Sequence, residues 1–162
     1  VNYFDGKEQC STRVRLIDYD TPLRNTFTVA NQWTVEEHSI RRANIIVFVN
    51  GLPLVVMELK SPSREQTNVS EAYAQLRNYL HKIPSLFVYN AFCVMSDMAI
   101  SKVGTITAGE DRFMEWKTAD GKDEVHRYAA FDVLFEGMFN KARLRVALSP
   151  DFSLFNVRIL SP

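Results

Sequence analysis

The sequence has few cysteines, no long apolar run and no excess of charge, and each shortage excludes something. No apolar segment approaches the roughly 18 residues of a membrane-spanning helix, so no transmembrane segment is expected. The first residues, VNYFDGKEQCSTRVR, lack the charged-then-apolar order of a signal peptide, which favours a cytoplasmic protein. Cys10 and Cys93 lie far apart without a CxxC or a histidine cluster, so free thiols are expected rather than a disulfide or a zinc site.

The charge balance also limits the function. The chain has 19 basic and 19 acidic residues, which gives a formal net charge of zero. A protein that binds nucleic acid unaided usually has a basic excess, because its affinity for phosphates comes largely from counterion release. If this chain acts on DNA, we expect another component to deliver it.

Several motifs of common enzymes are missing. The sequence contains neither GxxxxGK[ST] nor GxGxxG, so nucleotide sites of these two kinds are not expected. It contains no GxSxG and no motif centred on a nucleophilic cysteine. His38, His81 and His126 have no HExxH or other ligand spacing, and each is interpreted as an ordinary surface or core residue.

The residue patterns predict one α/β domain over residues 1–162, without repeats or linkers. Strands are predicted over 14–19, 26–35, 44–50 and 52–60. The last two are joined at Asn50-Gly51, a dipeptide typical of a tight hairpin turn. Their nearly continuous apolar composition predicts the centre of a sheet covered on both faces.

After Lys60 the period of the apolar residues becomes helical. The stripe from Val69 to Leu80 predicts a helix, with Ser70 as its N-cap and Pro84 beyond its end. One or two strands over 85–90 and 91–97, a strand over 100–107, a loop over 117–125 and a helix over 131–144 are expected to follow.

The most informative residues are Glu58 and Lys60 at the end of the apolar strand. Residues two apart on a strand project from the same face, so a carboxylate and an ammonium are expected side by side. Such a pair is costly to bury without a task or a partner. Hydrolytic metal sites supply such a task.

Two further features support a site at this pair. Gln75 and Tyr79 are spaced i, i+4 on the predicted helix and point the same way, so they could orient a phosphate, a water or the lysine. A simple polar flank of an amphipathic helix is the alternative. The residue that starts the first strand of the hairpin, Asn44, would be placed to share a metal with Glu58.

At this point the residues resemble a known family. The run RRANIIVFVNGLPLVVMELKSP (41–62) is similar to the motif of the restriction (R) subunit of type I restriction–modification enzymes, whose amino-terminal domain is a PD-(D/E)xK nuclease. The flanking segments are also similar to those of the family, over 21–35, 71–97, 103–117 and 131–144. The resemblance implies a restriction-endonuclease-like fold, in which helices flank a central mixed β-sheet.

The resemblance also implies roles for individual residues. Glu58 would be a metal-binding carboxylate, Lys60 the catalytic lysine, and Gln75 and Tyr79 the family's QxxxY motif, with the carbonyl of Leu59 as a further ligand of Mg²⁺. The ion would polarise the scissile phosphate and lower the pKa of an attacking water, while Lys60 would help to position that water. The reaction would be hydrolysis of a DNA phosphodiester without sequence reading by this domain.

The sequence departs from the family at Asn44, where an aspartate is usual. An amide oxygen can ligate Mg²⁺ but brings no negative charge to the ion. Asp18, Glu37 and Asp97 are candidates for a replacement acid, and the sequence does not choose among them. Either Asn44 serves as a weaker ligand, or the site no longer cuts. The second alternative is a silent module that keeps the fold and serves assembly, and an unrelated metal-dependent hydrolase is a third.

The resemblance implies partners outside the 162 residues. In the family a specificity subunit reads the DNA sequence, a methylase subunit completes the complex, and a helicase motor that follows the nuclease in the same polypeptide translocates double-stranded DNA with ATP. The chain is therefore expected to be a fragment of a larger R subunit, and this fragment itself is expected to bind no ATP. Apolar residues around Phe152 and Phe155 would pack on the motor or belong to the core of the domain.

Overall fold

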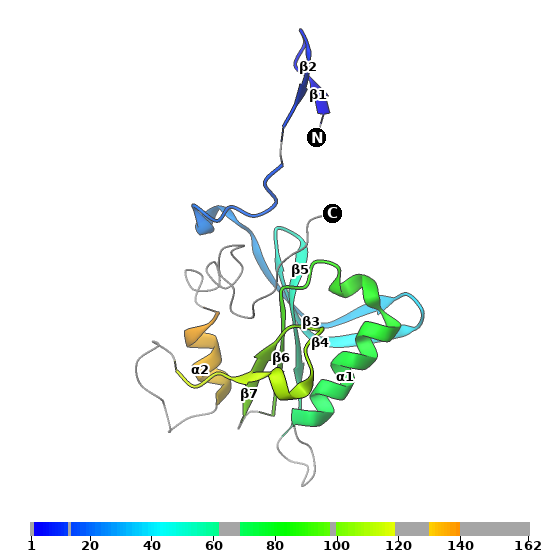
Figure 1. The fold of residues 1–162 in the computed structure, drawn as a ribbon, viewed down its shortest axis with the longest axis vertical. Coiled ribbons are helices and arrows are strands. Elements are labelled where there is room, and N and C mark those ends of the chain that lie inside the picture. The colour runs from blue at the N-terminus through cyan, green and yellow to red at the C-terminus, as the bar shows by residue number, and fades with distance from the viewer. Residues whose placement is uncertain (1, 13, 62–68, 98–99, 119–129, 140–162) are drawn as a thin grey trace.

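A mixed six-stranded sheet with a helix on each face organises the chain (Figure 1). The computed structural model describes residues 2–12, 14–61, 69–97, 100–118 and 130–139. The sheet has the order β3-β4-β5-β6-β7-β8, and all neighbours are antiparallel except the parallel pair β5 and β6. The α/β class with a central mixed sheet, which the sequence predicts, is confirmed.

The strands of this sheet are β3 (Phe27–Glu36), β4 (Ile40–Val49), β5 (Leu52–Leu59), β6 (Phe92–Ser96), β7 (Ser101–Gly104) and β8 (Met114–Glu115). The helices are α1 (Val69–Lys82) and α2 (Ala130–Gly137), with 3-10 turns η1 (Pro22–Arg24), η2 (Pro84–Phe87) and η3 (Glu110–Arg112). Strands β1 (Asn2–Phe4) and β2 (Gln9–Ser11) form a separate hairpin, which stands apart from the sheet at the top of Figure 1.

Strand β5 lies between β4 and β6 and is buried on both sides, as its continuous apolar sequence predicts. One core cluster lies on the α1 side of the sheet and includes Val56, Leu76 and Tyr79. The other lies on the α2 side and includes Met57 and Leu134. Successive residues of β5 thus point to opposite cores, which leaves Glu58 on the α1 side.

The turn between β4 and β5 has the predicted tight geometry. Asn50 has φ 51° and Gly51 has φ 82°, and two successive positive φ angles are the mark of a type I′ hairpin turn. The Asn50 side chain also donates hydrogen bonds to the carbonyl of Leu16 at 2.7 Å and to the Asn25 side chain at 2.8 Å. The turn therefore anchors the segment that leads into β3.

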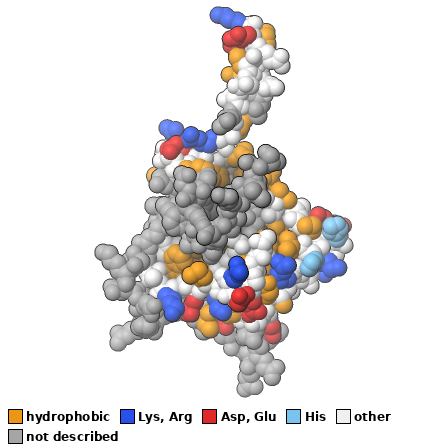
Figure 2. Space-filling model, viewed as in Figure 1, with side chains coloured by type: hydrophobic (Ala, Val, Ile, Leu, Met, Phe, Trp, Pro, Cys, Tyr) orange, Lys and Arg blue, Asp and Glu red, His pale blue; other side chains and the backbone are white. Residues whose placement is uncertain are grey.

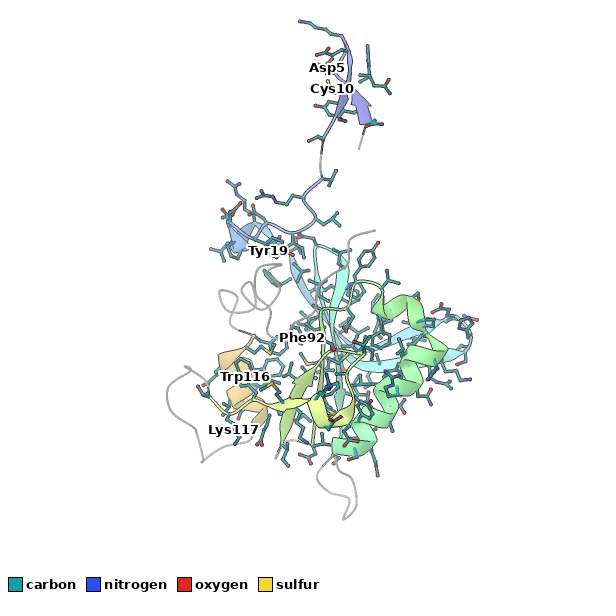
Figure 3. The ribbon with its side chains drawn as sticks, in the orientation of Figure 1. Asp5, Cys10, Tyr19, Phe92, Trp116 and Lys117 are labelled. Atoms are coloured by element: carbon teal, nitrogen blue, oxygen red, sulfur yellow. The ribbon has the colours of Figure 1, made fainter. Side chains whose placement is uncertain are left out.

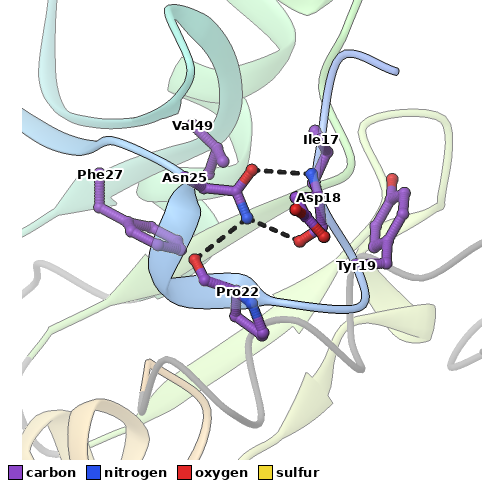
Figure 4. Close-up of a pocket in the computed structure, with 7 residues that line it drawn as sticks. All are labelled: Ile17, Asp18, Tyr19, Pro22, Asn25, Phe27 and Val49. Atoms are coloured by element: carbon purple, nitrogen blue, oxygen red, sulfur yellow. Dashed lines mark hydrogen bonds between the residues drawn. The ribbon is translucent and has the colours of Figure 1, made fainter.

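Asn25 is the centre of that anchor (Figure 4). Its amide donates to the carbonyls of Asp18 at 2.8 Å and Pro22 at 3.1 Å, and its carbonyl accepts the Asp18 backbone N–H at 2.8 Å. A small pocket lies here, and its lining is largely apolar: Ile17, Asp18, Tyr19, Pro22, Asn25, Phe27 and Val49. This polar network, and not a strand, orders the segment 14–26, so the strand predicted over 14–19 is wrong.

Other predicted elements differ at their ends. Residues 84–87 form the turn η2 and not a strand, because the N–H groups of Leu86 and Val88 bond the nearby carbonyls of Ile83 and Ser85, and the next strand begins at Phe92. The strand predicted over 100–107 is confirmed only for Ser101–Gly104. Ser70 lies inside the first turn of α1 and its hydroxyl bonds Glu110, so it is not the N-cap.

Four predictions fall partly or wholly outside the described residues. They concern the end of the helix 131–144, most of the loop 117–125, the region around Phe152 and Phe155, and His126. Among the described residues, no helix is long and apolar enough to cross a membrane. Cys10 and Cys93 are free thiols, as predicted.

Candidate active site

Glu58 and Lys60 share a face at the end of β5, as their two-residue spacing predicts. The Lys60 Nζ lies 3.1 Å from the Glu58 Oε1. Glu58 is only 3% exposed, whereas the side chain of Lys60 is 23% exposed. A buried carboxylate thus has a cation that reaches solvent beside it, and this cation offsets part of the cost of its burial.

Asn44 lies beside this pair, at the point where β4 separates from β5. The register of the two strands is regular from Val47 opposite Val55 to Ile45 opposite Met57 and then stops. One residue further, the Asn44 Oδ1 accepts the backbone N–H of Leu59 at 3.0 Å. The side chain of Asn44 therefore replaces a ladder hydrogen bond where the strands part, and we call this point the β4/β5 split.

The same position is irregular on the neighbouring strand. The β3–β4 register runs through Asn31 opposite Ile45 and Trp33 opposite Ala43, and it omits the pair Gln32 and Asn44. Gln32 has φ 53°, a left-handed conformation that is uncommon for a residue other than glycine. Beyond this pair, residues 33–43 leave the sheet as a two-stranded extension, here called the arm, which reaches towards the end of α1 (Figure 1).

The tip of the arm is bound to the end of α1. The backbone N–H of His38 donates to the carbonyl of Lys82 at 3.1 Å. The Glu37 carboxylate accepts the Ser85 hydroxyl at 2.8 Å and the Ser85 backbone N–H at 3.1 Å. The arm, β5 and α1 therefore enclose the region that holds Glu58 and Lys60.

Tyr79 of α1 connects these three elements. Its hydroxyl lies 3.1 Å from the Glu58 Oε2 and 2.9 Å from the carbonyl of Arg42 in the arm. The Gln75 side chain also hydrogen-bonds to this hydroxyl. Gln75 and Tyr79 thus point the same way, as the i, i+4 spacing predicts, and the tyrosine contacts the carboxylate directly.

The burial of this group changes its titration. Burial raises the pKa of Glu58, while the hydrogen bond and the positive charge of Lys60, together with the hydrogen bond from Tyr79, lower it by less. Burial likewise raises the pKa of Tyr79 to about 12, and the nearby charge of Arg41 opposes that rise. Tyr79 is therefore a hydrogen-bonding group at neutral pH and not a base.

The backbone of Lys60 is held by the parallel neighbour β6, since its N–H donates to the carbonyl of Ser96 at 2.8 Å. Asp97 follows Ser96 and lies at the same end of the sheet as Lys60. Its Oδ1 accepts the backbone N–H of Ile100 at 2.8 Å, which closes a turn. Of the three candidate acids, Asp97 is the one at this end.

The other two candidate acids lie elsewhere. Asp18 caps a turn, where its Oδ1 accepts the backbone N–H groups of Asp20 at 3.0 Å and Thr21 at 2.8 Å. This turn belongs to the Asn25 and Asn50 network, at the opposite end of the β4–β5 hairpin from Glu58. Glu37 is at the tip of the arm, on Ser85. The structure does not bring either of them to the pair.

The side-chain and backbone oxygens at the split are of the chemical type that binds hard cations such as Mg²⁺. The Asn44 amide oxygen contacts the backbone N–H of Leu59 at 3.0 Å, and Leu59 directly follows Glu58, whose carboxylate contacts Lys60. Oxygen ligands of this kind suit Mg²⁺, although the set contains a single carboxylate. The set would therefore hold the ion more weakly than two carboxylates would.

Among the described residues, one group of three metal-ligating side chains comes together, and it is remote from the split. It consists of Asp5, Glu8 and Cys10 on the β1–β2 hairpin, and Asp5 and Cys10 lie far above the sheet in Figure 3. The Asp5 Oδ1 already accepts the backbone N–H groups of Lys7 at 2.8 Å and Glu8 at 3.0 Å. Turn closure accounts for its position.

Sequence reasoning missed two contacts at the split. One is the Arg42 carbonyl, and the other is the Ser96 carbonyl, and neither has a side-chain signal because both are backbone atoms. The sequence does contain a signal for a third feature that was not predicted. Arg41 and Arg42 form a basic dipeptide shortly before Asn44, and the Arg41 guanidinium donates to the Asn78 side chain at 3.3 Å.

The chain is similar to known proteins along most of its length. The family model described as "Type I restriction enzyme R protein N terminus" matches residues 1–112. The type I restriction enzyme HindI endonuclease subunit of Haemophilus influenzae is 37% identical over 142 residues, which cover 86% of this chain and 13% of that protein. The putative MjaIXP endonuclease subunit of Methanocaldococcus jannaschii is 30% identical over 165 residues, covering 89% of this chain and 16% of that protein.

A mixed sheet that ends in a buried carboxylate and a lysine defines an α/β domain with a candidate hydrolytic site. With the match over residues 1–112, the chain belongs to the family of type I restriction enzyme R protein N-terminal domains. It spans about one seventh of the length of the two relatives, so it corresponds to a small part of such proteins.

Proposed function

We propose that this chain is the metal-dependent endonuclease domain of a type I restriction enzyme R subunit and hydrolyses DNA phosphodiesters. One observation supports this most directly. The buried Glu58 carboxylate has the Lys60 ammonium at 3.1 Å, at the split where Asn44 contacts Leu59. An ion pair with a purely structural role would not need to combine a buried acid with a partly exposed cation at the point where β4 and β5 separate.

In this proposal Glu58, Asn44 and the carbonyl of Leu59 would hold Mg²⁺. When bound, the ion would polarise the scissile phosphate and lower the pKa of a water. Lys60 reaches solvent, so its ammonium would contact the phosphoryl oxygens and stabilise the charge that develops there. The hydrogen bond to the Glu58 carboxylate holds the Lys60 ammonium in place.

Tyr79 and Gln75 would act as positioning residues. The Tyr79 hydroxyl lies within hydrogen-bond distance of both the Glu58 carboxylate and the Arg42 carbonyl and donates its single proton to one of them at a time, which keeps the carboxylate next to the arm. Gln75 adds a hydrogen bond to the same hydroxyl. Gln75 and Tyr79 would thus orient the Glu58 carboxylate, and Lys60 would be the residue that contacts the phosphate.

The partners follow from the family and are part of the proposal. The neutral net charge suits a domain that is brought to double-stranded DNA by specificity and methylase subunits. ATP-driven translocation would belong to motor domains of the same polypeptide, with no ATP bound here.

Lys60→Ala tests the proposal in the R subunit that contains this domain, assembled with its partner subunits. We expect nicking of a supercoiled plasmid in Mg²⁺ to fall at least about a hundredfold, because a preorganised charge at the transition state is lost. Lys7→Ala, on the remote β1–β2 hairpin, is the matched control and should cut normally.

A silent assembly module is the second candidate, and Asn44 favours it because the residue brings no charge to the metal. In that case the native complex would assemble and translocate without nicking, and Lys60→Ala would change nothing. Nicking that survives Lys60→Ala would contradict the proposed site.

A further inference from the structure

We infer that Arg41 binds a phosphate of the DNA strand that enters the β4/β5 split. This inference rests on the proposed function, since it takes DNA as the substrate of the site. A domain of neutral composition needs local cations to hold the DNA backbone, and Arg41 is placed to be one of them.

Arg41 faces the site and not the opposite side of the arm. Its Nε donates to the Asn78 Oδ1 at 3.3 Å, and one of its Nη atoms donates to the Ile40 carbonyl at 2.8 Å. It pairs in register with Val35, which packs on the α1-side core. The guanidinium is therefore turned towards α1, beside Tyr79.

The charge of Arg41 is held in place but not neutralised. Both of these acceptors are neutral oxygens, and among the described residues no carboxylate forms an ion pair with it. A guanidinium with a fixed orientation and remaining N–H groups is the side chain best suited to a phosphate. Asn78 therefore orients the donor without reducing its charge.

The position of Arg41 fits a contact next to the reacting phosphate. Asn78 directly precedes Tyr79, and the Tyr79 hydroxyl contacts both the Arg42 carbonyl and Glu58. Figure 2 shows Lys, Arg and His side chains gathered at the right of the view, over the arm and the end of α1. Glu36 and Glu37 are exposed carboxylates of the same arm, but neither forms an ion pair with Arg41.

Arg42 provides a matched control. It carries the same charge and is the next residue of β4, so its side chain points to the opposite face. It pairs with Thr34 and is exposed. If only the total charge of the arm mattered, the two arginines would be equivalent.

The test measures binding of the R subunit that contains this domain, assembled with its partner subunits, to a labelled duplex of mixed sequence by fluorescence anisotropy. Metal is omitted, and the salt concentration is varied. We expect Arg41→Gln, which keeps a donor for Asn78 but removes the charge, to weaken binding about tenfold. It should reduce the slope of log affinity against log salt by about one. Arg42→Gln should change affinity by less than about twofold.

Two further variants sharpen the result. Asn78→Ala leaves the charge but frees the guanidinium, so affinity should fall by less than in Arg41→Gln with an unchanged salt slope. Lys60→Ala should reduce affinity independently of Arg41. Circular dichroism and the thermal midpoint would check that each variant is folded.

Equal effects of Arg41→Gln and Arg42→Gln, or an unchanged salt slope in Arg41→Gln, would overturn the inference. The outcome is separable from the proposed function. A complex that does not nick DNA, but whose domain loses affinity with Arg41→Gln, would leave the phosphate contact standing and reject only the cleavage.

Discussion

The two ends of the β4–β5 hairpin use the same residue type for different purposes. At the turn end, Asn50 and Asn25 satisfy backbone groups in a network of neutral hydrogen bonds. At the split end, Asn44 also satisfies a backbone N–H, but its neighbours are a buried carboxylate and an ammonium. Asn50 and Asn44 both accept a backbone N–H where strand pairing ends, so this hydrogen bond does not by itself mark a functional site. The charged pair of Glu58 and Lys60 beside Asn44 distinguishes the candidate active site from the turn end.

The difference is also visible in conformation. Asn50 has a positive φ because a tight hairpin turn requires it. Gln32, opposite Asn44, has a positive φ without a turn, where both strands leave the sheet. Such a conformation in a non-glycine residue is maintained by its surroundings and is frequent at functional sites. Substitutions at each end should therefore have different consequences.

The largest effect on folding is expected at the turn end. Asn50→Ala removes three side-chain hydrogen bonds and places alanine at a positive φ, so the free energy of unfolding should fall by about 2 kcal/mol. Urea unfolding would measure it. Asn50→Gly loses the same hydrogen bonds but tolerates the positive φ angle. It should therefore be more stable than Asn50→Ala by the free energy of the backbone strain alone. A loss below about 0.5 kcal/mol in Asn50→Ala would mean that the network does not anchor the segment.

The next effect depends on pH and is expected only at the split end. The pKa of Glu58 is raised by burial, so the folded state holds a proton more readily than the unfolded state does. Stability from this group is present below the ordinary glutamate pKa of 4.5 and is lost as the pH rises through the higher folded value. Relative to Glu58→Gln, the unaltered protein should lose stability with a slope of at most about 1.4 kcal/mol per pH unit.

Unfolding by urea over a pH series checks this slope. Asn25→Ala is the control at the turn end, since it removes a neutral amide and its cost should not vary with pH. A difference between Glu58→Gln and the unaltered protein that stays constant across the series would show that burial does not perturb the carboxyl group.

The smallest effect is expected from Asn44→Asp. A carboxylate can accept the same N–H of Leu59 and adds a negative charge, so the affinity for Mg²⁺ should rise several-fold, by less than about 1.4 kcal/mol. Calorimetric titration measures the affinity, and plasmid nicking by the complex shows whether cleavage follows. Thr28→Asp, at an exposed position of β3 near the turn end, controls for added charge. If Thr28→Asp raised the affinity equally, the split would not be the metal site.

The sequence predicted those features that depend on local pattern. The Asn50-Gly51 turn, the shared face of Glu58 and Lys60, and the common direction of Gln75 and Tyr79 follow from backbone periodicity. They needed no knowledge of distant contacts. The family resemblance added the order of the segments, and the match over residues 1–112 confirms the family.

The features that escaped prediction depend on contacts between distant segments. The strand expected over 14–19 is replaced by side-chain hydrogen bonds to Asn25 and Asn50, which no local pattern reveals. The break in register at Gln32 and Asn44 depends on how β3 and β4 pair, so neither segment predicts it alone. The Tyr79 contact with the Arg42 carbonyl joins residues 37 positions apart, and a backbone acceptor carries no residue signature.

The arm has a mechanical consequence because it is attached at both ends. It leaves the sheet at Asn44, and its tip is tied through His38 to the last residue of α1 and through Glu37 to Ser85 of η2. The arm is thus a strut of fixed length that spaces the end of α1 from β5. Removing one cross-strand pair, Thr34 with Arg42, would shorten the strut by about 3.4 Å. Either the tip would detach from Ser85, or Tyr79 would be drawn away from Glu58, so the length of a distant hairpin sets the geometry of the carboxylate.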